Sequence, residues 1–439
     1  MVHEYTQKRA SEKWRMIGLL VYFLFVGIVA YGVFTLPLFH IMISFSILFL
    51  YLGCFFLLTY IEHERKPTPI LQKWPSLAIV IPAYNRGESL RTCLECVTKI
   101  QYPKKMQILV VDDASTDHTQ QILEEFKKKG IQSIRQPQNG GKSHAINTGI
   151  KKVKGEIIVV MDGDSYPAPD SVMKLVPNFY SHENVGAVTT IVRVHNRKGL
   201  LQRIQEVEYF LEFGLKNSVL NTLDSLYVTP GPLSAYKREA LEKAGGYDEH
   251  NITEDMEITF HLHKLGYRIV LEPDAQVFTD VPDTIPKLYK QRQRWSYGGW
   301  QTIHKYRKDL FSKQKFFFRI FFPLRVLLDI SAVFFLMLAT RMGMGYFHDI
   351  QGTLTAYSTI SFETIVFPPF YLNSHVLLYL LIVVLTLLMA YFGTRAAGAP
   401  ARQLSPLGIF LFLSIYWVFI IFIQATSLLR IIYGGRQKW

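Results

Sequence analysis

The sequence has few cysteines: Cys54, Cys93 and Cys96 are the only three in 439 residues. Three cysteines cannot build a disulfide framework. Cys93 and Cys96 form a C-x-x-C pair, but the sequence has no second pair that would complete a zinc site. The pair falls in a segment with the periodicity of an amphipathic helix, so we interpret both cysteines as packing residues.

Acidic residues are scarce relative to basic ones, and the formal net charge is +13. No basic run is interleaved with a recognisable nucleic-acid-binding module, which argues against nucleic acid as a partner. The hydrophobic content of 49%, counted without glycine, is high for a soluble domain. We therefore expect part of the chain to lie in lipid, with membrane lipids as partners and the cationic residues on the cytoplasmic side.

Five apolar stretches, 16–36, 40–60, 320–339, 376–392 and 407–428, approach the length of about 20 residues that a membrane-spanning helix needs. The first is too long for a signal peptide, no A-x-A-like site follows it, and the second begins almost at once. Basic residues precede this pair at 8, 9, 13 and 15 and follow it at 65 and 66. The positive-inside rule therefore predicts a hairpin with both ends, and the polar region 71–314, in the cytoplasm.

The number of spans stays open. Five spans would put the C-terminus outside, whereas Arg430, Arg436 and Lys438 favour the inside. A re-entrant segment at 365–371, interrupted by Pro368 and Pro369, would restore an even number of crossings. We expect an N-terminal transmembrane hairpin (1–70), a cytosolic domain (71–280), an amphipathic interfacial segment (281–316) and a C-terminal transmembrane region (317–439).

The cytosolic region has the pattern of an α/β fold. The runs 77–82, 107–111 and 156–161 are short, continuously apolar and rich in β-branched residues, as buried parallel strands are. Helical patterns lie around them at 88–100, 116–129 and 142–153. This alternation predicts a mostly parallel sheet with helices on both faces, and ligands of such sheets bind beyond the carboxyl ends of the strands.

Polar clusters follow each predicted strand. The clusters are Ala83-Tyr84-Asn85, Asp112-Asp113 and Asp162-Gly163-Asp164. No G-x-G-x-x-G follows the first strand, which argues against a dinucleotide site. The segment 139–143 ends like a P-loop, but the glycine required earlier is Gln136. Its glycine amides, with Lys142 at a helix N-terminus, still favour a bound phosphate.

Three further features have alternative interpretations. Asp162 and Asp164 offer hard oxygen ligands for Mg²⁺ or Mn²⁺, although alone they would be read as a solvated turn, and the other ligands of an EF-hand are missing. Glu254 and Asp255 follow Thr253 at the start of a helical pattern, where helix capping is the simpler explanation. The stretch 291–295 (QRQRW) is also typical of a membrane-surface helix.

Taken in order, these motifs resemble those of membrane-integrated family 2 glycosyltransferases: hyaluronan and cellulose synthases, and bacterial poly-N-acetylglucosamine synthases. The resemblance covers about 77–300, includes a loop at 229–238, and extends through the predicted membrane helices. It implies a Rossmann-like GT-A fold with a mostly parallel sheet, flanked by transmembrane α-helices.

The resemblance also implies site residues. Asp255 of the T-E-D motif would be the general base. The expected nucleotide-sugar-binding residues are Ala83, Tyr84, Asp112, Asp113, Lys142, Asp162, Gly163, Asp164, Gln291, Arg294 and Trp295. Asp162 and Asp164 would hold Mg²⁺ or Mn²⁺ with the diphosphate, and Asp112 and Asp113 would contact the uridine. The expected acceptor-binding residues are Gly231, Pro232, Glu254 and Trp295. The family's first motif often reads Tyr-Asn-Glu, but Arg86 follows Asn85 here, and we predict no role for it.

The implied activity is inverting transfer of N-acetylglucosamine or glucose from a UDP-sugar to a growing polysaccharide, with export through the membrane helices of a plasma-membrane protein. One alternative is transfer of one sugar to a lipid acceptor, and another is a nucleotide-sugar-sensing channel without turnover. An accessory membrane subunit is left open as a partner. Arg325 and Asp329, four residues apart, would line a saccharide channel or form a salt bridge near the cytosolic end of their helix.

Overall fold

The computed structural model describes residues 27, 31, 35–36, 38–63, 68–312, 315–357 and 374–432. These residues divide into two compact units. One comprises Phe55–Leu324 and Leu387–Leu413, and the other is drawn from Met1–Cys54, Arg325–Thr386 and Ser414–Trp439. The first unit contains the sheet and every residue of the predicted site.

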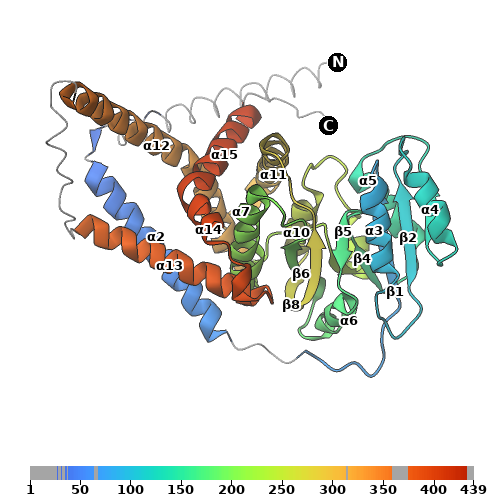
Figure 1. The fold of residues 1–439 in the computed structure, drawn as a ribbon. Coiled ribbons are helices and arrows are strands. Elements are labelled where there is room, and N and C mark those ends of the chain that lie inside the picture. The colour runs from blue at the N-terminus through green and yellow to red at the C-terminus, as the bar shows by residue number, and fades with distance from the viewer. Residues whose placement is uncertain are drawn as a thin grey trace, which may run out of the picture. The chain divides into compact units, whose positions relative to one another are not determined.

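The sheet has eight strands in the order β3-β2-β1-β4-β7-β6-β8-β5. Figure 1 shows β1 beside β2, and β6 beside β8. In chain order the strands are β1 (Leu77–Ala83), β2 (Gln107–Asp112), β3 (Gln132–Arg135), β4 (Ile157–Val160), β5 (Ser165–Pro167), β6 (Val185–Val194), β7 (Ser234–Lys237) and β8 (Arg268–Thr279). The pairs β1–β2, β1–β4, β2–β3 and β6–β8 are parallel, and the other three are antiparallel. The predicted α/β class with a mostly parallel sheet is confirmed.

Helices cover both faces of strand β1, which is buried along its whole length. Alternate side chains of β1, such as Ile79 and Ile81, join a core with α3 (Gly87–Val97) and α4 (Thr119–Lys127). Helix α5 (Lys142–Lys152) covers the other face, where a Cβ on Gly149 would lie 2.4 Å from Cγ1 of Val80. Strands buried on both faces need continuous apolar sequence, which explains why 77–82 was recognisable.

The second half of the unit was harder to predict. It adds α6 (Ser171–Leu175), α7 (Leu200–Tyr209), a π-helical stretch η2 (Phe210–Lys216), α8 (Asn217–Thr222), α9 (Arg238–Ala244), α10 (Glu254–Lys264) and α11 (Ile285–Tyr306). Strand β3 of the first half and strands β5 to β8 of the second half were not predicted. They include buried polar residues such as Thr189, Thr190 and Ser234, which interrupt the apolar pattern.

Four helices among the described residues are long and apolar enough to cross a membrane: Ile43–Glu62, Phe317–Gly345, Val376–Ala396 and Pro406–Leu428. They match four of the five predicted stretches. The first stretch, 16–36, lies mostly outside the described residues, and the re-entrant segment 365–371 lies entirely outside them. Helix α12 (Phe322–Tyr357) runs well past the predicted end at 339, since Arg341 ends the apolar pattern but not the helix.

Arg325 and Asp329 form an ion pair inside α12, with 2.8 Å between Nε and Oδ2. The pairing neutralises both charges within one helix, as the salt-bridge alternative predicts.

Candidate functional site

The carboxyl ends of the parallel strands carry the predicted polar clusters. Asp112 ends β2 beside the end of β1, Asp113 follows it, and both side chains are buried. Asp162 follows β4 by two residues. Because β7 runs antiparallel to β4, the loop that enters β7 meets this end of β4, and the amide of Asp162 donates to the carbonyl of Gly231 at 3.0 Å. The topology therefore brings three sequence motifs to one edge of the sheet.

Lys142 joins the D-G-D loop to the T-E-D motif. Its Nζ lies 2.5 Å from Oδ1 of Asp162 and 2.6 Å from Oε1 of Glu254. Burial opposes the charge of Lys142, but Asp162, Glu254 and Asp255 outweigh that effect and raise its pKa. Lys142 is thus a fixed cation between the D-G-D loop and the first turn of α10.

Asp162 and Asp164 lie in different electrostatic surroundings. Burial alone would raise the pKa of Asp162, but Lys142, Arg86 and Arg294 lower it overall. Burial and the neighbouring Asp162 raise the pKa of Asp164, against the opposing charge of Arg86. Both carboxylates remain partly exposed, at 21% and 26% of their side-chain surface, so they are accessible to a ligand.

We predicted no role for Arg86 from the sequence, yet its Nη1 lies 2.6 Å from Oδ2 of Asp164. The loop before α3 holds it there. Asn85 has a left-handed φ of 50°, and its Oδ1 accepts a hydrogen bond of 2.8 Å from the amide of Thr116. The signal that could have identified this contact is the basic residue at a position where related motifs carry an acid.

Asp255 lies in the first turn of α10 and is partly buried. Burial and the adjacent Glu254 raise its pKa to about 6, although Lys142 and Arg294 act in the opposite direction. A carboxylate with such a pKa is ionised at neutral pH and basic enough to accept a proton there. Asp255 and Lys142 line a small cavity together with Ile146, Val160, Thr229, Pro230, Gly231, Ser234, Tyr236, Tyr247 and Glu254.

Gly231 is enclosed by the charged groups of the site. A Cβ there would lie 2.6 Å from Oδ2 of Asp162 and 2.8 Å from Nζ of Lys142. We predicted that Gly231 and Glu254 bind the acceptor and that Lys142 binds the nucleotide sugar. In the structure, both Gly231 and Glu254 lie against Lys142. Pro232 follows Gly231 and is partly buried.

The expected phosphate loop at 139–143 is arranged differently from the prediction. The amides of Gly140 and Gly141 donate to the two carboxylate oxygens of Asp113, at 2.9 and 2.8 Å. These amides therefore do not face outward to a phosphate, because Asp113, at the end of β2, supplies the anion. Asp112 accepts a 2.9 Å hydrogen bond from the amide of Ser115, so Asp112 orders the loop after β2 whereas Asp113 orders the loop before α5.

The stretch 291–295 lies in α11. Arg294 acts electrostatically on both Asp162 and Asp255. We predicted no role for Arg292 from the sequence. Its side chain is buried, pairs with Glu208 of α7 and lies 4.1 Å from the ring centre of Trp295. Gln291 accepts a hydrogen bond from Arg292. Ala83 ends β1 as a buried residue, and Tyr84 after it is exposed.

The chain is similar in sequence to known enzymes. A poly-beta-1,6-N-acetyl-D-glucosamine synthase of Staphylococcus epidermidis is 31% identical over 233 residues, 53% of this chain and 56% of that protein. The enzyme of the same name from Staphylococcus aureus (strain COL) is 29% identical over 253 residues, 57% of this chain and 60% of that protein. The chain thus matches less than two thirds of the length of either relative.

The fold is also shared with a solved structure. The mannosyltransferase PcManGT from Pyrobaculum calidifontis, in complex with GDP-Man and Mn²⁺, superposes with a TM-score of 0.61 at 18% identity, over 94% of this chain and 100% of that one. This likeness shows the GT-A fold. Residues 75–298 match the profile described as Glycosyltransferase like family 2, which confirms the predicted resemblance. With its motifs at the strand ends of a GT-A sheet and half of its length inside that profile, the chain belongs to glycosyltransferase family 2.

Proposed function

We propose that this protein is an inverting glycosyltransferase that transfers N-acetylglucosamine or glucose from a UDP-sugar to a growing polysaccharide. The observation that carries the proposal is the position of Lys142, within 2.6 Å of both Asp162 and Glu254. Lys142 thus links the D-G-D loop to the first turn of α10, and it lines a small cavity together with Asp255, whose pKa is raised. The names of the two staphylococcal relatives support a polymer of N-acetylglucosamine as the product.

The donor would bind along the strand ends, with the uridine near Ala83, Tyr84, Asp112 and Asp113. Asp162 and Asp164 would hold Mg²⁺ or Mn²⁺. The donor set fits, since Mg²⁺ uses one or two carboxylates and completes its shell with phosphate oxygens and water. The described residues contain no cluster of three or more His, Cys, Asp or Glu that would bind a metal alone, which agrees with a shared diphosphate. When bound, the metal would stabilise the charge of the departing diphosphate.

The chain's own residues would carry the proton and the charge. Asp255 accepts the proton of the acceptor hydroxyl while the oxygen of that hydroxyl bonds to the anomeric carbon. The bond from that carbon to the diphosphate breaks, and its electron pair leaves with the diphosphate. Lys142 and Arg294 are the cations placed to stabilise this charge. Gln291 and Trp295 would bind the nucleotide sugar. Trp295 would also contact the acceptor, which Gly231, Pro232 and Glu254 would border.

We further propose a multi-pass plasma-membrane protein whose GT-A domain is cytosolic, with the polymer exported through its helices. The four apolar helices support a membrane location. The segment 281–316, which includes α11, would lie at the membrane surface, between the GT-A domain (71–280) and the C-terminal spans (317–439). The hairpin within 1–70 would anchor the other end.

The test is to incubate the purified full-length protein with labelled UDP-N-acetylglucosamine or UDP-glucose and Mg²⁺ or Mn²⁺, and to size the product. We expect a polymer, loss of transfer with a chelator, and a decrease of about 10²- to 10⁴-fold for Asp255→Asn. A single-sugar glycolipid would replace the polymerase proposal with the lipid-acceptor alternative. UDP-sugar binding without any turnover, unaffected by Asp255→Asn, would indicate a sensing channel.

A further inference from the structure

Helix α11 touches the T-E-D turn at a glycine. A Cβ on Gly298 would lie 2.5 Å from both Cγ2 and Oγ1 of Thr253, the buried residue that precedes Glu254 and Asp255. No side chain fits at such a distance, so the backbone of α11 approaches the turn as closely as glycine allows. Gly298 follows Arg294 by one helical turn.

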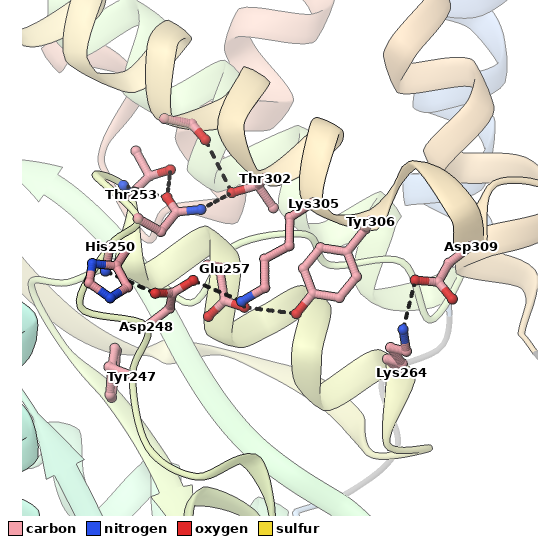
Figure 2. A network of polar contacts seen from close by, with 12 residues as sticks. Tyr247, Asp248, His250, Thr253, Glu257, Lys264, Thr302, Lys305, Tyr306 and Asp309 are labelled. Atoms are coloured by element: carbon pink, nitrogen blue, oxygen red, sulfur yellow. Dashed lines mark hydrogen bonds and ion pairs between the residues drawn. The ribbon is translucent and has the colours of Figure 1, made fainter. Parts of the chain in front are cut away.

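A chain of hydrogen bonds fixes this crossing. The amide of Thr253 donates to Oδ1 of Asn251 at 2.9 Å, and Nδ2 of Asn251 donates to Oγ1 of Thr302 at 3.0 Å. The Thr302 hydroxyl then donates to the carbonyl of Gly298 at 3.1 Å, so the chain returns to the contact point (Figure 2). Asn251, Thr253 and Thr302 are all buried, where an unmade hydrogen bond is costly.

A second attachment lies one turn further along α11. Nζ of Lys305 lies 2.5 Å from Oε1 of Glu257, and the hydroxyl of Tyr306 donates to the same oxygen at 2.8 Å. Lys305 also pairs with Asp248 at 2.8 Å, as Figure 2 shows. Glu257 is fully buried, so breaking this pairing would leave a buried charge unpaired. Two attachments therefore hold the C-terminal half of α11 to α10 and to the loop before it, and rotation about the glycine contact is restrained.

The attached helix carries the cation that acts on the site. Arg294 lies one helical turn before Gly298, and Asp255 follows Thr253 by two residues, so the contact between Gly298 and Thr253 sets how the two elements that carry these groups are spaced. We propose that Gly298 and the Asn251–Thr302 pair are positioning residues, which set the separation between the carboxylate of Asp255 and the guanidinium of Arg294. They act through those two groups and touch neither substrate. This inference rests on the proposed function, because the separation matters when a hydroxyl loses its proton as a diphosphate leaves.

The chain offers a matched control next to the contact. A Cβ on Gly299 would meet only Met256, at 3.8 and 3.9 Å, which is ordinary contact. Gly298→Ala and Gly299→Ala make the same chemical change in the same helix and gain the same helix propensity. We expect Gly298→Ala to lower kcat by about 10- to 100-fold, since misplacement by about 1 Å has such effects. Gly299→Ala should stay within about twofold of the wild type.

Three readouts separate positioning from general damage. In Gly298→Ala, UDP binding should stay near the wild-type value and the protein should remain folded at the assay temperature while kcat falls, although overpacking at Thr253 lowers the unfolding temperature. Thr253→Ala, which removes both atoms at 2.5 Å, should restore part of the lost kcat when combined with Gly298→Ala. If Gly298→Ala proves unstable, Thr302→Val and Thr302→Ser serve instead, because valine keeps the shape and loses the hydroxyl whereas serine retains it.

The outcomes distinguish the inference from the proposed function. Equal kcat values for the two alanine variants in an active protein overturn the inference alone, as does a loss of UDP binding that accounts for the whole effect. If the wild type shows no turnover, the proposed function fails, and hydrogen exchange of the full chain then decides. The amides of Ile252 and Thr253 donate to Gln301 and Asn251. They should exchange faster in Gly298→Ala than in Gly299→Ala, and equal rates overturn the positioning contact.

Discussion

At the residue scale, the pKa of Asp255 predicts how activity depends on pH. Burial and Glu254 raise this pKa to about 6, and a general base must be ionised to act. The transfer rate should therefore fall as pH drops through about 6 and level off above it. Steady-state kcat across pH 5 to 8 measures this. A flat profile would argue against Asp255 as the base.

Removing the charge of Lys142 tests whether Asp255 is the group that sets this pH dependence. Its charge lowers the pKa of Asp255, so its removal should have the opposite effect. In Lys142→Met, the acidic limb of the residual activity should move to higher pH. A limb that stays in place would show that another group titrates.

The close packing around Gly231 supports another prediction at the residue scale. A Cβ would intrude to 2.6 Å from Asp162 and 2.8 Å from Lys142, two charged groups held by each other. Gly231→Ala should raise the KM for the donor by about tenfold or more, equivalent to about 1.4 kcal/mol. The control is Gly343→Ala, because a Cβ at Gly343 meets nothing within 4 Å. Equal KM values for the two variants would contradict the prediction.

At the scale of elements, two glycines pack the end of α13 (Ser374–Ala396) against η2. A Cβ on Gly214 would lie 2.3 Å from the carbonyl oxygen of Gly393, and one on Gly393 would lie 2.5 Å from that of Phe210. Backbone atoms cannot yield as a flexible side chain does. Alanine at either position should destabilise the protein by about 1–3 kcal/mol, the usual cost of overpacking.

Thermal unfolding in detergent measures this effect, with Gly343→Ala as the reference. Each of Gly214→Ala and Gly393→Ala should unfold at a lower temperature than that reference. If both unfold with it, the contact between α13 and η2 does not contribute to stability.

At the scale of the whole molecule, the proposed topology predicts which side of the membrane carries the sheet. Residues 128–130, after α4, are exposed and can accept an inserted protease site. A protease added to inverted membrane vesicles should cut there, whereas right-side-out vesicles should protect the site until detergent is added. Cleavage in intact right-side-out vesicles would contradict a cytosolic GT-A domain.

Much of the architecture was readable because it depends on local sequence. Strands β1, β2 and β4 are buried by neighbours on both faces and so are continuously apolar, and the four described membrane-type helices have the same kind of signal. The order of the motifs indicated the family for a similar reason. The later strands were not predicted because polar residues interrupt their apolar pattern. These residues are buried because they form hydrogen bonds in the folded chain, as Thr189 does with Ser234.

The sequence by itself determined the class of the sheet, the membrane helices and the residue types available for chemistry, since each depends on composition within a short window. Only the tertiary structure decided which groups face one another. Lys142 lies between Asp162 and Glu254, Arg86 pairs with Asp164, and Asp113 occupies the glycine amides expected to bind phosphate. Contacts of this kind depend on distances across separate elements, and no local pattern encodes a distance of 2.5 Å between residues far apart in the chain.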